Sequence, residues 1–147
     1  YIIARPTNNY GIGQYVEKLI PKSCKHLHLG KQIPLHNSGT PIRNWLHAQD
    51  TANAVVTIIE SNTQNEIYNI AGGFEQTNIE TVKKIIKEYL GDVDYSSYID
   101  TTLNRKGQDV RYALDDSKLR ELDWKPEKQF DVELPNIVKY YKDKFIW

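Results

Sequence analysis

The sequence contains one cysteine, no methionine and no excess of charge of either sign. A single cysteine, Cys24, cannot form an internal disulfide, and without a C-x-x-C pair or another metal-ligand cluster we expect no metal site. This cysteine usage fits the reducing cytoplasm, where we expect the protein to be. Nineteen basic side chains balance nineteen acidic ones, which argues against a nucleic-acid-binding protein.

A long hydrophobic run is also lacking. The longest apolar stretch, around residues 54–59, is far too short to cross a bilayer, so we expect no membrane partner. A hydrophobic content of 39% and a charged content of 26% are ordinary for a globular domain with a core. The chain opens without methionine on the apolar, strand-like residues 1–4. We therefore expect it to be a piece of a longer protein.

Short β-prone segments alternate with stretches of helical periodicity. Strands are expected at residues 1–5, 33–36, 42–47, 67–70 and 98–102. Helices are expected at residues 16–29, 50–60, 79–90, 117–122 and 132–145. A loop is expected at the Asn- and Gly-rich residues 7–13. The alternation predicts an α/β layer arrangement.

Local signals support several of these elements. Thr77 followed three residues later by Glu80 fits a capping box at the start of a helix. Asp50 is a candidate N-cap for the helix that follows it. Ile2 and Ile3 are expected to be buried at the centre of the first strand.

Two familiar patterns are present but incomplete. Gly11 and Gly13 lie between a strand and a helix, as in the dinucleotide fingerprint G-x-G-x-x-G, but Val16 stands where the third glycine belongs. Tyr140 and Lys144 have the Y-x-x-x-K spacing that can lower a tyrosine pKa, but they lie in the last turns of the last expected helix. We interpret the first pattern as a glycine-rich turn and the second as the solvated face of a terminal helix.

Two arginines are placed as a bound anion would need them. Arg43 is followed by the apolar Trp45 and Leu46, as on a strand that holds the guanidinium toward a ligand. Arg105 lies in a polar loop beside Gly107, where the backbone could approach a ligand. Arginine offers a fixed fork of always-charged donors, so two arginines and one lysine could neutralise a pyrophosphate.

Seven segments follow one another in an order that is more specific than any one of them. They are R-P-T-N-N-Y-G at 5–11, E-K-L-I-P at 17–21, I-R-N-W-L-H at 42–47, Y-N-I-A-G-G at 68–73, E-Q-T-N at 75–78, N-R-K-G-Q-D-x-R-Y at 104–112 and L-D-W-K-P at 122–126. This set resembles the C-terminal portion of nucleotide-sugar 4,6-dehydratases, in the dTDP-glucose 4,6-dehydratase family of extended short-chain dehydrogenase/reductases. The resemblance implies that residues 1–147 are the smaller, C-terminal substrate-binding domain with the last strands of a Rossmann-type parallel sheet, at about 1–5 and 67–70.

The resemblance also implies a binding site for a nucleotide-diphosphate sugar. Asn8 would bind the substrate near its phosphates, Arg43 would be the phosphate arginine, and residues 104–108 would close over the nucleotide. The implied substrate-binding residues are Asn8, Lys18, Leu19, Pro34, Leu35, His36, Arg43, Asn78, Asn104, Arg105 and Gln108. Asn9 would lie on the nicotinamide side of the cofactor NAD.

For the whole enzyme the resemblance implies that NAD⁺ oxidises the hexose at C4, water leaves across C5–C6, and the hydride returns to C6. The residues of that chemistry precede Asn8 in the family, and none of them is present here. We therefore expect no catalytic residue in this chain, which alone should be inactive. NAD would be bound mainly by an N-terminal half that this chain lacks, and the parent enzyme would be a homodimer.

The chain departs from the family pattern at several positions. Ile12 stands where proline is usual, and Asn44 where aspartate is common. His36 and His47 stand where tyrosine is common, and Gln108 where histidine is common. These differences leave the implied phosphate residues in place, but they leave the choice between thymidine and uridine nucleotides open.

Other interpretations stay open. The parent could be a related 4-epimerase or a UDP-glucuronate decarboxylase, or the chain could be a noncatalytic nucleotide-binding or interaction module. Taken singly, Asn8 and Asn9 could be turn residues, Lys18 a solvated lysine and Asn78 only a helix cap. Arg43 could form a surface ion pair that contributes little to stability. Together and in this order, the residues favour nucleotide-sugar binding.

Overall fold

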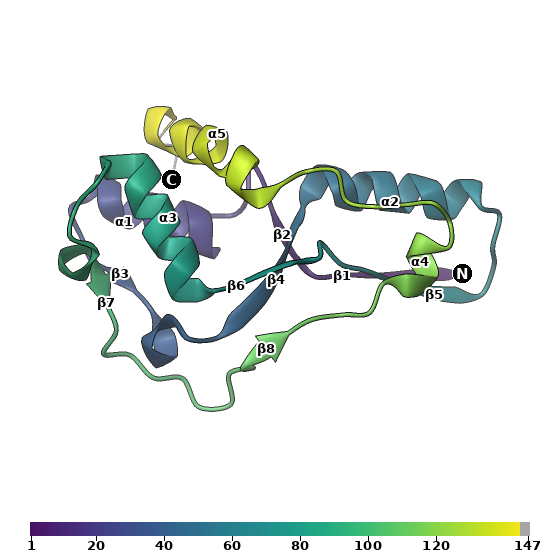
Figure 1. Cartoon of the computed structure of the whole chain (residues 1–147), viewed down its shortest axis with the longest axis horizontal. Helices are drawn as coiled ribbons and strands as arrows, with labels where there is room; N and C mark the ends of the chain where they lie inside the picture. Colours follow the sequence, from purple (N-terminus) through teal and green to yellow (C-terminus); the bar gives the residue numbers. More distant parts are fainter. Residues whose placement is uncertain (145–147) are drawn as a thin grey trace.

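The structure, a computed structural model, describes residues 1–144. Its helices are α1 (Leu19–His28), α2 (Ala48–Glu60), α3 (Asn78–Leu90), α4 (Ser117–Arg120) and α5 (Phe130–Asp143), with 3₁₀ turns η1 (His36–Gly39) and η2 (Tyr95–Tyr98). Its strands are β1 (Ile2–Pro6), β2 (Asn8–Tyr10), β3 (Ile33–Pro34), β4 (Ile42–His47), β5 (Glu66–Ile70), β6 (Phe74–Thr77), β7 (Ile99–Asp100) and β8 (Arg111–Tyr112). In Figure 1, α1, α3 and α5 gather at one end of the molecule, and α2, α4, β1 and β5 gather at the other.

Strand β4 joins the two ends of the molecule. It pairs in parallel with β2 and β8 and antiparallel with β6, and it runs through the middle of Figure 1. A separate parallel pair, β1 with β5, lies at the α2 end, while β3 pairs in parallel with β7 at the other end. Parallel strands joined through helices confirm the predicted α/β class.

The three-helix end holds the larger core, because the apolar faces of α1, α3 and α5 meet there. The largest fully buried side chains of these helices are Ile20, Val82, Ile85, Ile86, Leu134, Ile137 and Val138. The rings of Tyr10, Trp45 and Phe130 close this core against β2 and β4, with ring centroids between 4.9 and 6.2 Å apart. Each such side chain contributes about 1.5–3 kcal/mol by leaving water, so this burial holds the helices over the sheet.

A smaller core fills the space between α2, β5 and α4. It consists of Leu46, Ala54, Ile58, Tyr68, Ile70, Leu119 and Trp124. The side chains of β1 do not join this core. Ile2 and Ile3 are 37% and 40% exposed, so the prediction that they are buried is wrong for this chain. Within residues 1–144 β1 pairs only with β5, and it contributes no side chain to either core.

One buried amide connects the two sheets. Asn44 is 4% exposed, and its Oδ1 accepts hydrogen bonds from Thr7 Oγ1 at 3.0 Å and from the Gly72 N–H at 2.9 Å. Thr7 lies between β1 and β2, and Gly72 lies between β5 and β6. A Cβ on Gly72 would come within 1.7 Å of the Trp45 carbonyl oxygen, so only glycine allows this approach.

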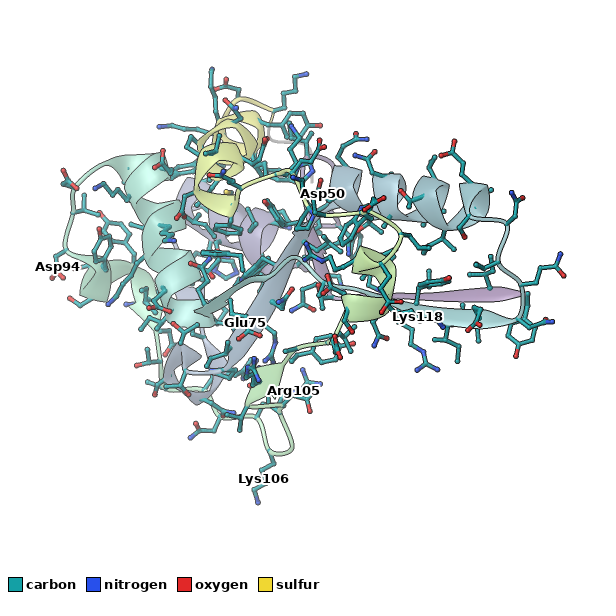
Figure 2. The ribbon with its side chains drawn as sticks, turned by 45° about the vertical axis from the view of Figure 1, so that its right-hand side comes forward. Asp50, Glu75, Asp94, Arg105, Lys106 and Lys118 are labelled. Carbon is teal, nitrogen blue, oxygen red and sulfur yellow. The ribbon has the colours of Figure 1, made fainter. Side chains whose placement is uncertain are left out.

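The start of α2 differs from its prediction. The N-cap is His47, whose Nδ1 accepts the Gln49 N–H at 3.1 Å. Asp50, predicted as the cap, lies inside the first turn and is 1% exposed. Its carboxylate instead accepts the backbone N–H groups of Glu127 and Lys128, both at 3.1 Å. Asp50 therefore ties the segment between α4 and α5 to α2 (Figure 2).

Other predicted elements hold with changes. The capping box at the start of α3 is confirmed, since Thr77 Oγ1 accepts the Glu80 N–H and Glu80 accepts the Thr77 N–H. The expected loop at 7–13 contains β2, and the pairing strands β6 and β8 were not predicted. Helix α1 begins three residues later than expected. The expected end of the last helix at Phe145 lies outside the described residues.

Replacing Asn44 by alanine leaves the Thr7 hydroxyl and the Gly72 N–H without their acceptor. We predict that Asn44→Ala lowers the free energy of unfolding by about 2–4 kcal/mol, since each unsatisfied buried donor costs about 1–3 kcal/mol. Urea denaturation followed by circular dichroism measures the loss. Asn53→Ala, on the exposed face of α2, is the matched control and should change stability by less than about 0.5 kcal/mol. A loss below about 1 kcal/mol for Asn44→Ala contradicts the bridging role.

The cap of α2 makes the fold sensitive to acid. Burial lowers the pKa of His47 from its ordinary value, and nearby Glu133 and Asp50 oppose this shift only in part. The unfolded chain therefore takes up the proton at a higher pH than the folded chain does. Stability from His47 is complete above about pH 7.5 and is lost as the pH falls below about 6.5.

We predict that His47→Asn, which keeps a capping oxygen but does not titrate, flattens the fall in unfolding free energy between about pH 7 and pH 5. Denaturant titrations across this range measure the slope. An identical slope in His47→Asn and the unchanged protein contradicts the assignment.

Candidate functional site

An open cleft of about 760 Å³ lies where β2 and β4 meet the N-terminal ends of α1 and α3 and the loop between β7 and β8. Most of the residues predicted from the sequence line it. They are Asn8, Asn9, Lys18, Leu19, Arg43, Asn78, Arg105 and Gln108. These residues come from positions up to 100 residues apart (Asn8 to Gln108), so only the fold brings them together.

Four predicted residues do not line this cleft. Leu35 is 3% exposed, and its side chain packs in the three-helix core, because Leu35 shares the inward face of its segment with Ile33. Pro34 is half-buried, and His36 and Asn104 are exposed. The sequence also missed lining residues, among them Gln14, Glu17 and Trp45. Glu17 lies in the E-K-L-I-P segment at 17–21, but its negative charge gives no reason to predict it beside a bound anion.

Arg43 is held by backbone carbonyls. Its guanidinium Nη1 donates to the Ile42 carbonyl at 2.7 Å and to the Asp109 carbonyl at 3.0 Å. Neither contact neutralises its charge, and no ion pair to Arg43 is found among the described residues. The predicted alternative, a surface ion pair, is therefore absent from the part of the chain that is described. Arg43 presents an uncompensated cation to the cleft.

The N-terminus of α1 offers a second set of donors. Its N-cap, Lys18, makes no side-chain cap, and the first turn of α1 contains no acidic residue. The N–H groups of Leu19 and Ile20 therefore have no partner within the helix, and the helix dipole adds positive potential. The α3 N-terminus is different, because Glu80 occupies it with a carboxylate whose pKa is lowered by hydrogen bonds from Thr77. An anion should favour α1.

The cleft gathers three cations, Lys18, Arg43 and Arg105, against one carboxylate, Glu17. Such an excess attracts a small anion of two or more charges. The described lining contains no cysteine, serine, histidine or tyrosine, the side chains that most often act as nucleophile or proton carrier. The lining therefore has the charge and the hydrogen-bond donors that an anion needs.

Asn9 has little freedom to bind a cofactor with its side chain. Its Nδ2 donates to the Thr7 carbonyl at 3.0 Å, and its Oδ1 accepts from Thr51 Oγ1 at 2.7 Å. Its own carbonyl accepts from Gln14 Nε2 at 2.7 Å. Gly11 and Gly13 do not make the three-glycine cradle that a dinucleotide needs.

Two further features bear on ligand class. In residues 1–144, no helix combines the length and the apolar character needed to cross a membrane. No group of three or more His, Cys, Asp or Glu side chains in this same part of the chain is arranged to hold a metal ion.

The first half of the sequence can be compared with known families. Residues 1–71 match the NAD dependent epimerase/dehydratase family. The match covers β1, β2, β4 and β5 and therefore includes one wall of the cleft.

Individual relatives match almost the whole chain. A dTDP-glucose 4,6-dehydratase of Haemophilus influenzae is 38% identical over 95% of this chain and 44% of its own length. The low-salt glycan biosynthesis protein Agl12 of Haloferax volcanii is 35% identical over 95% of this chain and 44% of its own length. The chain therefore spans less than half the length of these curated relatives.

Solved structures agree in fold. The dTDP-glucose 4,6-dehydratase of Bacillus anthracis, in complex with NAD, superposes with a TM-score of 0.88 at 37% identity, over 99% of this chain and 46% of that one. A UDP-glucose 4-epimerase of Thermotoga maritima superposes with a TM-score of 0.86 at 22% identity, over 99% of this chain and 47% of that one, which shows a shared fold only. The fold is that of an extended short-chain dehydrogenase/reductase.

The cleft predicts a measurable affinity for inorganic pyrophosphate that depends on Arg43. We expect Arg43→Ala to weaken it by about 1.5–3 kcal/mol, or roughly 10- to 150-fold, the scale of a charge-assisted hydrogen bond. Arg43→Lys keeps the charge but loses the planar set of guanidinium donors, so its affinity for pyrophosphate should lie between those of the unsubstituted chain and Arg43→Ala. Isothermal titration calorimetry measures the dissociation constants. Arg120→Ala, which removes an equal charge on α4, should leave them unchanged, and the same affinity in Arg43→Ala contradicts the anion site.

Proposed function

We propose that the chain is the nucleotide-sugar-binding portion of an NAD-dependent 4,6-dehydratase acting on dTDP- or UDP-glucose. The product of the whole enzyme is the 4-keto-6-deoxy sugar nucleotide. In this proposal the chain corresponds to the C-terminal part of the enzyme and contributes no catalytic residue. The observation that carries it is the convergence of Lys18, Arg43 and Arg105 with Asn8 and Asn78 around one cleft.

The chemistry of the cleft matches the middle of a nucleotide sugar. A diphosphate needs cations and N–H donors, which Arg43, Arg105, Lys18 and the α1 N-terminus supply. The side-chain amide of Asn8 lies on the wall of the cleft. It has both donors and an acceptor, so it can form hydrogen bonds with the hydroxyl groups of a sugar or ribose. The volume of about 760 Å³ suits a ligand of this size.

The relatives support the reaction class. Proteins named dTDP-glucose 4,6-dehydratase from several bacteria and from mouse are 33–38% identical to nearly all of this chain. When bound, NAD supplies the hydride chemistry of such an enzyme. In the proposed parent the cofactor lies mainly against residues outside this chain, with Asn9 at its nicotinamide side. A homodimer is proposed for the parent.

Two alternatives follow from other observations. The epimerase structures share the fold, so a sugar-nucleotide 4-epimerase, or a UDP-glucuronate decarboxylase, is the second candidate within the same class. Decarboxylation calls for an extra cation facing a substrate carboxylate, and the described cleft lining holds no cation beyond the three already assigned to the phosphates. A noncatalytic nucleotide-binding module is the candidate of another class, since the cleft needs no upstream residue to bind an anion.

Incubating the full-length protein with NAD⁺ and either dTDP-glucose or UDP-glucose tests the proposal. We expect a 4-keto-6-deoxy product, detected by mass as the loss of one water from the sugar nucleotide. A C4 epimer of unchanged mass would instead support the epimerase alternative. UDP-glucuronate is the third substrate to offer, since its decarboxylation would support the decarboxylase alternative. If the full-length protein transforms none of the three but binds dTDP or UDP, it is a binding module.

A further inference from the structure

The turn η1 contains two residues in a conformation that few side chains adopt. Asn37 has φ 51° and ψ 43°, and Ser38 has φ 54° and ψ 20°. Asparagine tolerates this left-handed region better than most residues, whereas serine is strained there. The turn persists because its surroundings hold it. A Cβ on Gly39 would meet Leu35 and Ile79 at 2.8 Å, so the turn is pressed against α3 and the core.

This conformation directs the Asn37 amide at the loop between β7 and β8. Asn37 Oδ1 accepts the Arg105 N–H at 2.9 Å, and Nδ2 donates to the Arg105 carbonyl at 3.3 Å. The same Nδ2 donates to Gln108 Oε1 at 3.2 Å, and the Asn37 N–H donates to the Leu103 carbonyl at 2.8 Å. One residue therefore holds the loop at three points, 66 to 71 residues further along the chain.

The loop has few other restraints. Residues 101–107 are all exposed, and the most covered large apolar side chain among them, Leu103, is still 39% exposed, so apolar burial contributes little to their position. Beyond Gln108, the Arg43 guanidinium holds the Asp109 carbonyl, and the Ile42 N–H holds the Val110 carbonyl. These contacts fix the end of the loop near β8, but they leave its centre to Asn37. Figure 2 shows Lys106 extending away from the body of the molecule, whereas Arg105 and Gln108 line the cleft.

The contact to Gln108 also has a direction. Because Asn37 Nδ2 is a donor, Gln108 must face it with Oε1, which turns its own Nε2 donors toward another acceptor. Phosphate oxygens and the carbonyl oxygens of a pyrimidine are such acceptors. Asn37 therefore selects the amide orientation in which Gln108 donates to a ligand.

We propose that Asn37 is a positioning residue of the nucleotide site. It fixes the loop so that Arg105 and Gln108 face the cleft before the ligand arrives, and it thereby sets the affinity for a nucleoside diphosphate. This inference rests on the proposed function. A loop ordered in advance does not lose conformational freedom on binding, and each mobile side chain ordered by a ligand weakens binding.

Asn37→Gly tests this directly, because glycine accepts the same backbone conformation and removes only the amide. We expect the dissociation constants of uridine diphosphate and thymidine diphosphate, measured by calorimetry on the whole chain, to rise roughly tenfold. Asn37→Asp keeps the acceptor for the Arg105 N–H, but it loses both donations and adds a negative charge beside the anion site, so it should weaken binding at least as much as Asn37→Gly. Asn62→Gly is the matched control, since Asn62 has φ 55° and does not line the cleft. It should change neither constant more than twofold.

A double-mutant cycle separates positioning from general destabilisation. In a chain that carries Arg105→Ala and Gln108→Ala, Asn37→Gly should cost less than a further twofold, because the side chains through which it acts are gone. Hydrogen exchange of the amides at 103–108 should accelerate in Asn37→Gly without any ligand.

Each other outcome decides against the inference. A similar loss of affinity in both backgrounds, or no loss in Asn37→Gly, overturns the positioning role. Unchanged exchange at 103–108 shows that Asn37 does not fix the loop and overturns it as well. If the unsubstituted chain binds neither diphosphate, the proposed function fails, while the exchange measurement still decides whether Asn37 holds the loop.

Discussion

Both the fold and the cleft depend on the two hydrogen bonds that the buried Oδ1 of Asn44 accepts. This oxygen accepts from Thr7 and from Gly72, and it thereby fixes the β1–β5 pair relative to the sheet built around β4. Two neighbours of these hydrogen-bonded residues line the cleft. Asn8 comes directly after Thr7, and Arg43 comes directly before Asn44. Because side chains alternate along a strand, anchoring Asn44 on one face directs Arg43 to the other. This hydrogen-bond network thus determines where Arg43 points.

The sequence predicted what local signals encode. The capping box of Thr77 and Glu80, the apolar stripe of α3 and the strands at 42–47 and 67–70 are all read from neighbouring residues. The strands β2, β6 and β8 were missed, since their short segments become strands only by pairing with β4. Asp50 was misassigned for a related reason. A carboxylate near a helix start suggests a cap, whereas its partners at 127 and 128 are 77 and 78 residues away.

The cleft itself required more than periodicity. The charges of Arg43 and Arg105 suggested an anion site, but the grouping of Asn8, Lys18 and Asn78 with them came from the resemblance of ordered motifs. Leu35 shows the limit of assigning roles by resemblance, because its side chain packs in the core and does not line the cleft. Asn37 shows the opposite case. Its turn-forming sequence with Ser38 and Gly39 predicts a tight turn, but nothing in the sequence predicts that its amide would reach Arg105 and Gln108.

The central claim is that one cleft, formed by segments from both halves of the chain, binds a nucleoside diphosphate. Backbone amide chemical shifts of the ¹⁵N-labelled chain, followed while uridine or thymidine diphosphate is added, test it most directly. The account predicts that the shifted amides cluster at Asn8, at residues 18–20 and 43, at Asn78 and at residues 104–108. Shifts that cluster instead around Arg120 and Lys128, or no shifts at millimolar nucleotide, would contradict it.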